Sequence, residues 1–389
     1  MFLTDWENWD MKKTVVFVIA FLAVSCFSSC GQGEMQDWQA MPLVVLENVS
    51  PAAYMFYNPE DGLFELPVAG ATGWAAIYLP LHEAEADGST RVVGTLPPGQ
   101  GFTILEAHNG WWYILVGGTT GWVMSRYCMI NLPDILPSMV FNITNHASSL
   151  FRSSGRVIPK ITGRSLYNSR DFNARFGREK YIAAVLYGMA GKIAAAQRAA
   201  LADGNTLIMY EAFRPAQAHN LVYESFHDLV NTDPVVRAGV STPPWNTRWF
   251  LAASPYNHQR GTAIDVSLAR IDQFEVRSSG DFAYIHVTRH TPHRMQTPMH
   301  EMSIDAVVFS RPVHSRSLVA WKQAEFSERA TPGTILMHRY LTDAGLIPLA
   351  SEWWHFNDLV HTAYAIEWGI TGEFFLDSTY SMPPWLTRE

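Results

Sequence analysis

The chain changes character near residue 132. Before that point, short apolar runs are separated by Gly, Pro, Asn and Asp, as in short strands joined by tight turns. Beyond it, Ala-rich stretches with helical spacing of apolar residues adjoin apolar strands. The 389 residues allow two or three domains. We therefore expect a small all-β domain at 41–131, a linker "LPDILPS" at 132–138, and an α+β domain at 138–389.

The β pattern is clearest at 74–130. Pro-Gly, Asn-Gly and Gly-rich turns divide this segment into short strands. We predict strands at 91–95, 102–106, 111–116 and 121–124, a number and spacing that suggest a small barrel. The preceding part, 41–73, can be described only as β-like.

The second part predicts several helices. Ile182, Val185, Met189 and Ile193 recur at helical spacing, which predicts a helix over 179–205 with Gly204 as its stop. An apolar strand, "TLIMYEAF", follows directly. We also expect helices at 216–230 and at 332–344, the latter ending at Gly345.

The N-terminal residues resemble an export signal. From Met11, two lysines precede the uncharged stretch 14–24, which is too short to span a bilayer and fits a secretory signal. Cys26 and Cys30 follow small residues, so the segment resembles a bacterial lipoprotein signal in which one cysteine is lipidated. Either cysteine suits that role, and cleavage without lipidation is the alternative. The acidic residues before Met11 fit no signal, so Met11 is an alternative start.

This interpretation makes residues 1–30 a signal region and 31–40 a tether. We expect a protein exported across the inner membrane of a bacterium and held in the cell envelope by a lipid anchor, facing the periplasm or the surface.

The net charge of −8, with no long basic run, argues against a nucleic-acid partner. Only Cys128 remains in the folded part, which excludes an internal disulfide and a cysteine metal site. Any metal must be held by His and carboxylate groups.

One candidate metal motif is "SPYNHQRGTAIDVSL" at 254–268. Gly261 permits a turn after His258, and the strand that follows returns Asp265 towards it. A histidine nitrogen and a carboxylate oxygen are suitable zinc ligands, and a third ligand from elsewhere would leave the fourth position to water. Taken alone, such a pair is more often structural.

The stretch "SEWWHFND" at 351–358 can supply the third ligand and a catalytic base. His355 would be the third ligand, and Glu352 the base that takes a proton from the attacking water. However, residues three apart on a regular strand face opposite sides. The hypothesis therefore requires a bulge or a strand end between Glu352 and His355.

Arg214 is a further candidate in "YEAFRPAQAHN". It follows an apolar strand and precedes Pro215, at the mouth of a strand-to-helix turn. A guanidinium in this place could stabilise the oxyanion that forms when water attacks a peptide carbonyl. The alternative is that Arg-Pro simply opens the helix.

Together, "FRP", "HQRGTAID" and "EWWHF" resemble the zinc D-alanyl-D-alanine dipeptidases, which are related to DD-carboxypeptidases and hedgehog-like metallopeptidases. The resemblance covers about 140–389, including "NITNHASSLFRSSGRVIPKI" and "MHRYLTDAGL". It implies an α+β domain with a central antiparallel sheet, and hydrolysis of a D-alanyl-D-alanine or related bond in cell-wall metabolism. It also implies one Zn²⁺ per chain on His258, Asp265 and His355, with Glu352 as base and Arg214 as transition-state stabiliser.

Residues 74–130 resemble bacterial SH3-like modules, through "VVGTLPPG", "GWWYIL" and "GWV". The resemblance implies a module that contacts cell-wall peptide or packs on a catalytic partner. A spacer with no ligand is the alternative.

Two departures from the dipeptidase pattern concern the substrate. A serine two positions before the first zinc-binding histidine is replaced by Tyr256. The segment whose aspartate contacts the substrate's free amino group corresponds here to "MQTPMHEM", with His300 in that place and Glu301 beside it. A histidine cannot pair with an ammonium group as a carboxylate does. Either Glu301 substitutes, or no free amino terminus is required.

The second case would allow longer peptidoglycan stems, as for a DD-carboxypeptidase or endopeptidase. A wall-binding lipoprotein without catalytic activity is a hypothesis of a different class. We interpret His286, His290 and His293 as surface-loop histidines rather than a second metal site.

Overall fold

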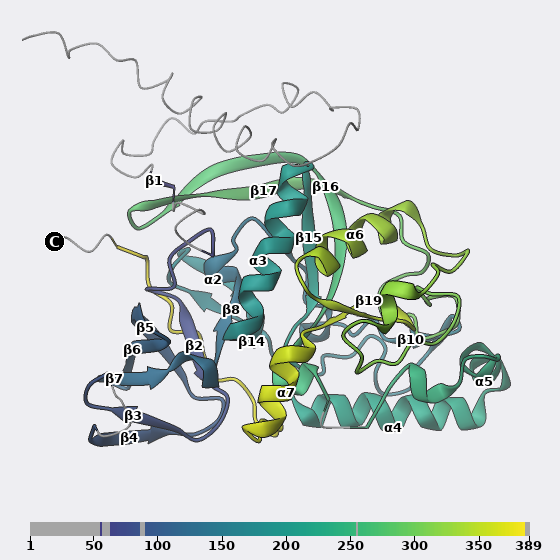
Figure 1. The fold of residues 1–389 in the computed structure, drawn as a ribbon, viewed down its shortest axis with the longest axis horizontal. Coiled ribbons are helices and arrows are strands. Elements are labelled where there is room, and N and C mark those ends of the chain that lie inside the picture. Colours follow the sequence, from purple (N-terminus) through teal and green to yellow (C-terminus); the bar gives the residue numbers. More distant parts are fainter. Residues whose placement is uncertain (1–54, 57–62, 86–89, 254–255, 386–389) are drawn as a thin grey trace, which may run out of the picture.

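The computed structural model describes residues 55–56, 63–85, 90–253 and 256–385 (Figure 1). The expected signal region, the tether and the two candidate lipidation cysteines lie outside these residues. The described chain is an α+β structure built on two main sheets. Within it, no helix combines the length and the apolar character needed to cross a bilayer.

The eight-stranded sheet forms the part whose sequence resembles bacterial SH3-like proteins, called the module below. Its strand order is β14-β8-β2-β5-β6-β7-β3-β4. The strands are β2 (Thr72–Ala75), β3 (Leu79–His82), β4 (Val92–Leu96), β5 (Gly101–His108), β6 (Trp111–Val116), β7 (Thr119–Met124), β8 (Cys128–Asn131) and β14 (Ala184–Leu186). The four strands predicted from turn signals are confirmed to within two residues, because short apolar runs between Gly-containing turns leave little choice of register.

The seven-stranded sheet is mainly antiparallel and carries the site. It runs β1-β17-β16-β15-β9, with β19 added on β16 and β18 on β19. Its strands are β1 (Met55–Phe56), β9 (Val140–Phe141), β15 (Asn205–Glu211), β16 (Ala263–Ser279), β17 (Phe282–Pro292), β18 (Ile347–Leu349) and β19 (Glu352–Asn357). β16 and β17 form a long hairpin that arches over the rest of the molecule (Figure 1). β1, from the segment described only as β-like, pairs with β17 rather than with the module.

Helices pack around the sheets. They are α2 (Leu132–Ile135), α3 (Tyr187–Ala202), α4 (Ala216–Thr232), α5 (Pro234–Ser241), α6 (Pro332–Asp343) and α7 (Leu359–Glu367). Two small hairpins complete the domain: β10 (Arg152–Ser153) with β11 (Arg156–Val157), and β12 (Arg170–Asn173) with β13 (Arg178–Tyr181). The predicted helices at 216–230 and 332–344 are confirmed as α4 and α6, and Gly345 follows α6 with φ of 85°.

The helix predicted over 179–205 is wrong at its start. Residues 184–186 form β14, which pairs with β8, and the helix begins only at Tyr187. Val185 is fully buried in this pairing. Its apolar character therefore reflects a strand that joins the module's sheet, and tertiary pairing overrides the helical spacing.

The segment 132–138 is not a free linker. It contains α2, and all its residues are buried. The buried Asp134 side chain accepts hydrogen bonds from the Thr72 amide (2.9 Å) and the Asn173 side chain (2.6 Å). These bonds compensate for the burial of a carboxyl group and fix the module against the second domain.

A C-terminal segment, residues 370–385, also binds the module. The Trp74 indole donates to Asp377 (3.1 Å), and the Met382 amide donates to the Gly70 carbonyl (2.7 Å). At Gly99, φ is 86° and an added Cβ would lie 2.1 Å from the Phe375 carbonyl oxygen. Only glycine permits this close approach. The module is thus held by β14 on one side and by this segment on another.

Candidate active site

A tight turn sets the position of His258. The 3-10 turn His258–Arg260 ends at Gly261, which has φ of 66°. A Cβ on Gly261 would lie 2.9 Å from the Leu186 backbone nitrogen, and that nitrogen donates to the Gly261 carbonyl (2.7 Å). The turn therefore requires glycine for two reasons, its backbone conformation and the contact with β14.

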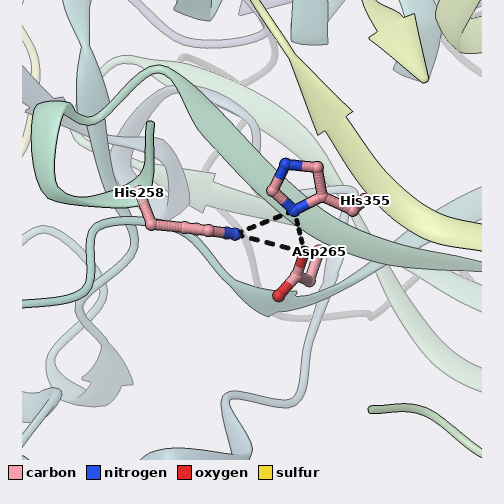
Figure 2. Close-up of side chains that lie close together, drawn as sticks. All are labelled: His258, Asp265 and His355. Carbon is pink, nitrogen blue, oxygen red and sulfur yellow. Dashed lines mark hydrogen bonds and ion pairs between the residues drawn. The ribbon is translucent and has the colours of Figure 1, made fainter. Parts of the chain in front are cut away.

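Three neighbouring strands bring acidic and imidazole groups into one row. Asp265 on β16 is paired with Glu211 on β15 and with His355 on β19. The flanking Ile264 and Val266 are fully buried in the apolar core. Strand alternation thus separates the core face from the site face, and His258 reaches this row from its turn (Figure 2).

The hydrogen bonds of the two imidazoles leave their lone pairs aimed at each other. His258 Nδ1 lies 2.7 Å from the Ala212 carbonyl oxygen, which can only accept, so Nδ1 carries the proton. His355 Nε2 lies 2.9 Å from Asn357 Oδ1, an oxygen that also accepts from the Asn257 side chain. The remaining nitrogens, His258 Nε2 and His355 Nδ1, are 3.2 Å apart.

This arrangement fits a metal ion. Asp265 Oδ1 lies 3.2 Å from His258 Nε2 and 3.0 Å from His355 Nδ1, so three ligand atoms surround one point (Figure 2). Two atoms bonded to a tetrahedral zinc ion at about 2.0–2.1 Å lie about 3.3 Å apart. Facing lone pairs at such a distance repel each other unless a cation or a proton lies between them. These three residues could therefore hold zinc.

The bulge required near Glu352 is confirmed. Pro348 of β18 pairs with Phe356, but the next residue, Leu349, pairs with Glu352. The three residues in between have no partner on β18, and the strand is rotated locally. Glu352 and His355 consequently face the same pocket, with Glu352 Oε2 3.8 Å from His355 Nδ1.

The two tryptophans between them are packing residues. Trp353 and Trp354 are 2% and 1% exposed and do not line the pocket. The Trp353 indole donates to the Thr297 hydroxyl (2.9 Å), and the two rings meet edge to face. By filling the core they hold the bulge in place, so the direction of the Glu352 and His355 side chains depends on them.

The two carboxyl groups of the pocket have pKa values shifted in opposite directions. Burial raises the pKa of Glu352 from 4.5 to about 8, an effect that His355 reduces and Asp265 reinforces. Burial also opposes ionisation of Asp265, but the neighbouring His258, His300 and His355 hold its pKa well below the usual value. Asp265 is thus suited to binding a metal as an ionised ligand, and Glu352 is suited to carrying a proton.

Arg214 is fixed in the pocket wall by its neighbours. Its guanidinium donates two hydrogen bonds to Glu211, one of them 2.9 Å long, and a third to His219 Nδ1 (3.1 Å). Burial and the charge of Arg214 lower the pKa of His219 to about 3, so this ring is a neutral acceptor. Arg214 Nη2 lies 3.6 Å from Asp265 Oδ2. The positive charge is therefore held beside the ligand group without side-chain freedom.

Glu211, Asp265 and His300 form a second group of possible ligand atoms. The guanidinium of Arg214 lies against both carboxylates, so their charge is balanced without a metal ion. We therefore assign a metal only to the group of His258, Asp265 and His355.

His300 lies behind Asp265 rather than in the pocket. It is fully buried, its Nε2 is 3.0 Å from Asp265 Oδ2, and its ring stacks on Phe151 with 4.1 Å between centroids. The carboxylate can only accept, so His300 donates to it. Glu301 also lies outside the pocket and accepts from the Gly155 amide (3.2 Å), whereas Tyr256 lines the pocket.

The histidines interpreted as surface-loop residues lie elsewhere. His286 and His290 are on β17, and His293 follows it and bonds to Asn205 (2.8 Å). The loop placement is wrong for the first two, because β17 continues to Pro292. In the described part of the chain these three residues form no group suited to a metal.

The sequence did not point to Asn357, Asn257 or His219 as site residues. Asn357 could have been found, because it lies two positions after His355 and faces the same side of the strand. Asn257 and His219 act through side-chain contacts between distant segments, for which the sequence carries no local signal.

Three converging ligand atoms, a nearby carboxyl group with a raised pKa and a fixed guanidinium group form an arrangement typical of metal-dependent hydrolases. The family model described as D-ala-D-ala dipeptidase, peptidase family M15, matches residues 155–368, more than half of the chain. The protein belongs to this peptidase family. A bacterial SH3 domain model matches residues 78–128. No curated protein matches the chain.

Replacing His300 with phenylalanine is expected to weaken zinc binding about 10- to 100-fold, because an orienting hydrogen bond to Asp265 is lost while an aromatic ring can still stack on Phe151. Competition with a chromogenic chelator measures this. His300→Gln, which keeps an N–H donor, should lose less. His290→Phe, on the hairpin, is the control. Unchanged affinity in His300→Phe would show that Asp265 needs no such support.

Proposed function

We propose that this protein is a zinc-dependent peptidase that hydrolyses a D-alanyl-D-alanine or related D-amino-acid peptide bond in cell-wall metabolism. The observation that carries the proposal is the convergence of the His258 and His355 lone pairs and Asp265 Oδ1 on one point. The family membership supports the reaction class. The signal-like N-terminus supports a further proposal, that the enzyme works in the bacterial cell envelope on a lipid anchor.

In this mechanism His258, Asp265 and His355 would hold the zinc. When bound, zinc supplies Lewis-acid polarisation of the scissile carbonyl and lowers the pKa of the attacking water. Glu352 lies at the edge of the ligand group, so its carboxylate can take a proton from the water without occupying a ligand position. Its raised pKa then allows it to hold that proton and pass it to the leaving amine.

Arg214 would stabilise the negative charge on the carbonyl oxygen. Its guanidinium is already fixed by Glu211 and His219 before substrate binds. A pre-oriented cation in a buried wall requires little reorganisation when charge develops. Burial lowers the pKa of Arg214, but the charge of Glu211 raises it by more. The net pKa is above its usual value, so the group stays cationic.

The test is metal removal. We expect one zinc per chain by elemental analysis, and release of D-alanine from peptides ending in D-alanyl-D-alanine, detected by mass spectrometry. Dialysis against a chelator should abolish the release, and added zinc should restore it, because two imidazoles and one carboxylate hold the ion. The L-alanyl-L-alanine counterpart is the control substrate. Hydrolysis that survives chelation would contradict the proposal.

A further inference from the structure

The pocket in front of the ligand group contains few negative charges. Among its described lining residues, the carboxylates are those of Asp265 and Glu352. The proposed function uses Asp265 as a metal ligand and Glu352 as the proton carrier. A free ammonium group next to the scissile bond would therefore find no unoccupied carboxylate in this lining.

The two residues near the position expected for ammonium recognition do not change this. The side chain of His300 is directed to Asp265 and is fully buried. Glu301 accepts hydrogen bonds from the backbone of the β10–β11 hairpin, at the Gly155 amide. Burial raises the pKa of Glu301, which further weakens it as a counterion.

One exposed arginine lines the pocket, and two more arginines lie close to lining residues. Arg248 lines the pocket next to Trp249, and Arg316 follows the lining residue Ser315. Arg260 lies close to Arg316 and to the lining residue Tyr256. Burial and the charge of Arg316 lower the pKa of Arg260, and Tyr256 raises it. We call Arg248, Arg260 and Arg316 the arginine rim.

Two members of the arginine rim are available to a ligand. Arg248 and Arg316 are exposed and form no ion pair with any residue that the structure describes. Guanidinium groups bind carboxylates with paired, charge-assisted hydrogen bonds. A cationic mouth also raises the local concentration of an anionic substrate.

From these two observations we infer that the substrate is an anionic peptide ending in D-alanyl-D-alanine whose amino side is acylated, and that it binds through a carboxylate to Arg248. The inference rests on the proposed function and specifies its substrate. The preferred reaction is then removal of the terminal residue from a longer chain, rather than cleavage of the free dipeptide.

The bond changes follow from this orientation. Water adds its oxygen to the carbonyl carbon of the penultimate alanine, and the C–N bond to the terminal alanine breaks. Glu352 takes one proton from the water and gives it to the leaving nitrogen; the second proton of the water passes to the released amine as the new carboxyl group ionises. The products are a peptide shortened by one residue, with a new carboxylate, and free D-alanine, so no oxidant or other reactant is needed.

The test compares four peptides on the zinc-loaded, full-length protein. They are D-alanyl-D-alanine, its N-acetyl derivative, and two acetylated tetrapeptides with the same D-alanyl-D-alanine end, one containing glutamate and the other glutamine. We expect kcat/KM to be at least about tenfold higher for the N-acetyl derivative than for the free dipeptide. The glutamate peptide should exceed its glutamine counterpart, and the difference should shrink with added salt.

Arg248→Gln should raise KM about tenfold with a smaller change in kcat, because it removes a charge-assisted contact at the mouth. A higher KM for every acylated peptide places Arg248 at the terminal carboxylate. A higher KM for the glutamate peptide alone places Arg248 at the side-chain carboxylate. Both results support the inference. Arg289→Gln, an exposed arginine on β17, is the matched control.

The outcomes separate the inference from the function. A free dipeptide cleaved as well as the acylated peptides would overturn the inference and leave the proposed function standing. The same holds if Arg248→Gln and Arg289→Gln behave alike. If the zinc-loaded protein cleaves none of the four peptides, both the function and the inference fail.

Discussion

Glu352→Gln is expected to reduce peptide hydrolysis about a hundredfold to ten-thousandfold, because glutamine cannot take the proton of the attacking water. The same change should make the metal-free protein more stable at about pH 8. The carboxyl group is buried, and burial raises its pKa from 4.5 to about 8. An amide of similar shape fits this site without an ionisation penalty.

The sign of the pH effect follows from the raised pKa. The folded protein binds the Glu352 proton more tightly than the unfolded chain does, so this contribution to stability is complete below pH 4.5. It is lost as the pH rises through about 8. The free energy of unfolding of the metal-free wild type should therefore fall across this range more steeply than that of Glu352→Gln.

Urea unfolding in the presence of a chelator, at about pH 5 and about pH 8, measures this difference. Glu224→Gln, a change at an exposed glutamate on α4, is the control and should alter neither activity nor the pH dependence. Equal hydrolysis by wild type and Glu352→Gln would exclude Glu352 as the base. Parallel unfolding profiles would show that its carboxyl group is not desolvated in the folded protein.

Arg214→Gln is expected to destabilise the protein by about 3–5 kcal/mol, because Glu211 is left as a buried charge without its main partner. Both side chains are almost completely buried, with 3% and 0% exposure. Hydrolysis should also fall about a hundredfold or more, as for the loss of an oxyanion donor. Stability by urea unfolding and kcat on a saturating substrate measure the two effects.

The double variant Arg214→Gln with Glu211→Gln separates these roles. Removing both charges should recover much of the stability, since Asn145 and Tyr167 can still donate to an amide oxygen at position 211. Activity should remain low, because the cation is still missing. If the double variant regains activity along with stability, Arg214 serves the fold and does not act on the substrate.

The sequence predicted the parts of the structure that depend on local patterns. Turn signals located the strands of the module, and the mismatch between Glu352-x-x-His355 and strand alternation required the bulge found at β18 and β19. The start of α3 was missed because residues 184–186 are both helically spaced and suited to a strand, and only the edge of β8 decides between them.

The position of His300 could not be predicted for a related reason. Its place in the segment that corresponds to the substrate-binding segment of the dipeptidases suggested contact with substrate, but its direction depends on a left-handed backbone (φ of 60°) and on the Phe151 ring. Phe151 is nearly 150 residues away in the chain, and its ring contacts leave no periodic signal. Tertiary contacts of this kind decide which buried groups face a pocket and which support its walls.

The C-terminal segment has a consequence for the time course of folding. In most multidomain chains the part made first can fold first. Here the Trp74 indole of β2 finds its acceptor, Asp377, 303 residues later in the chain. Strand β14, which extends the same sheet, also belongs to the later domain. The module is thus synthesised before the segments that complete its packing, so its native packing reports that the whole peptidase domain has been assembled.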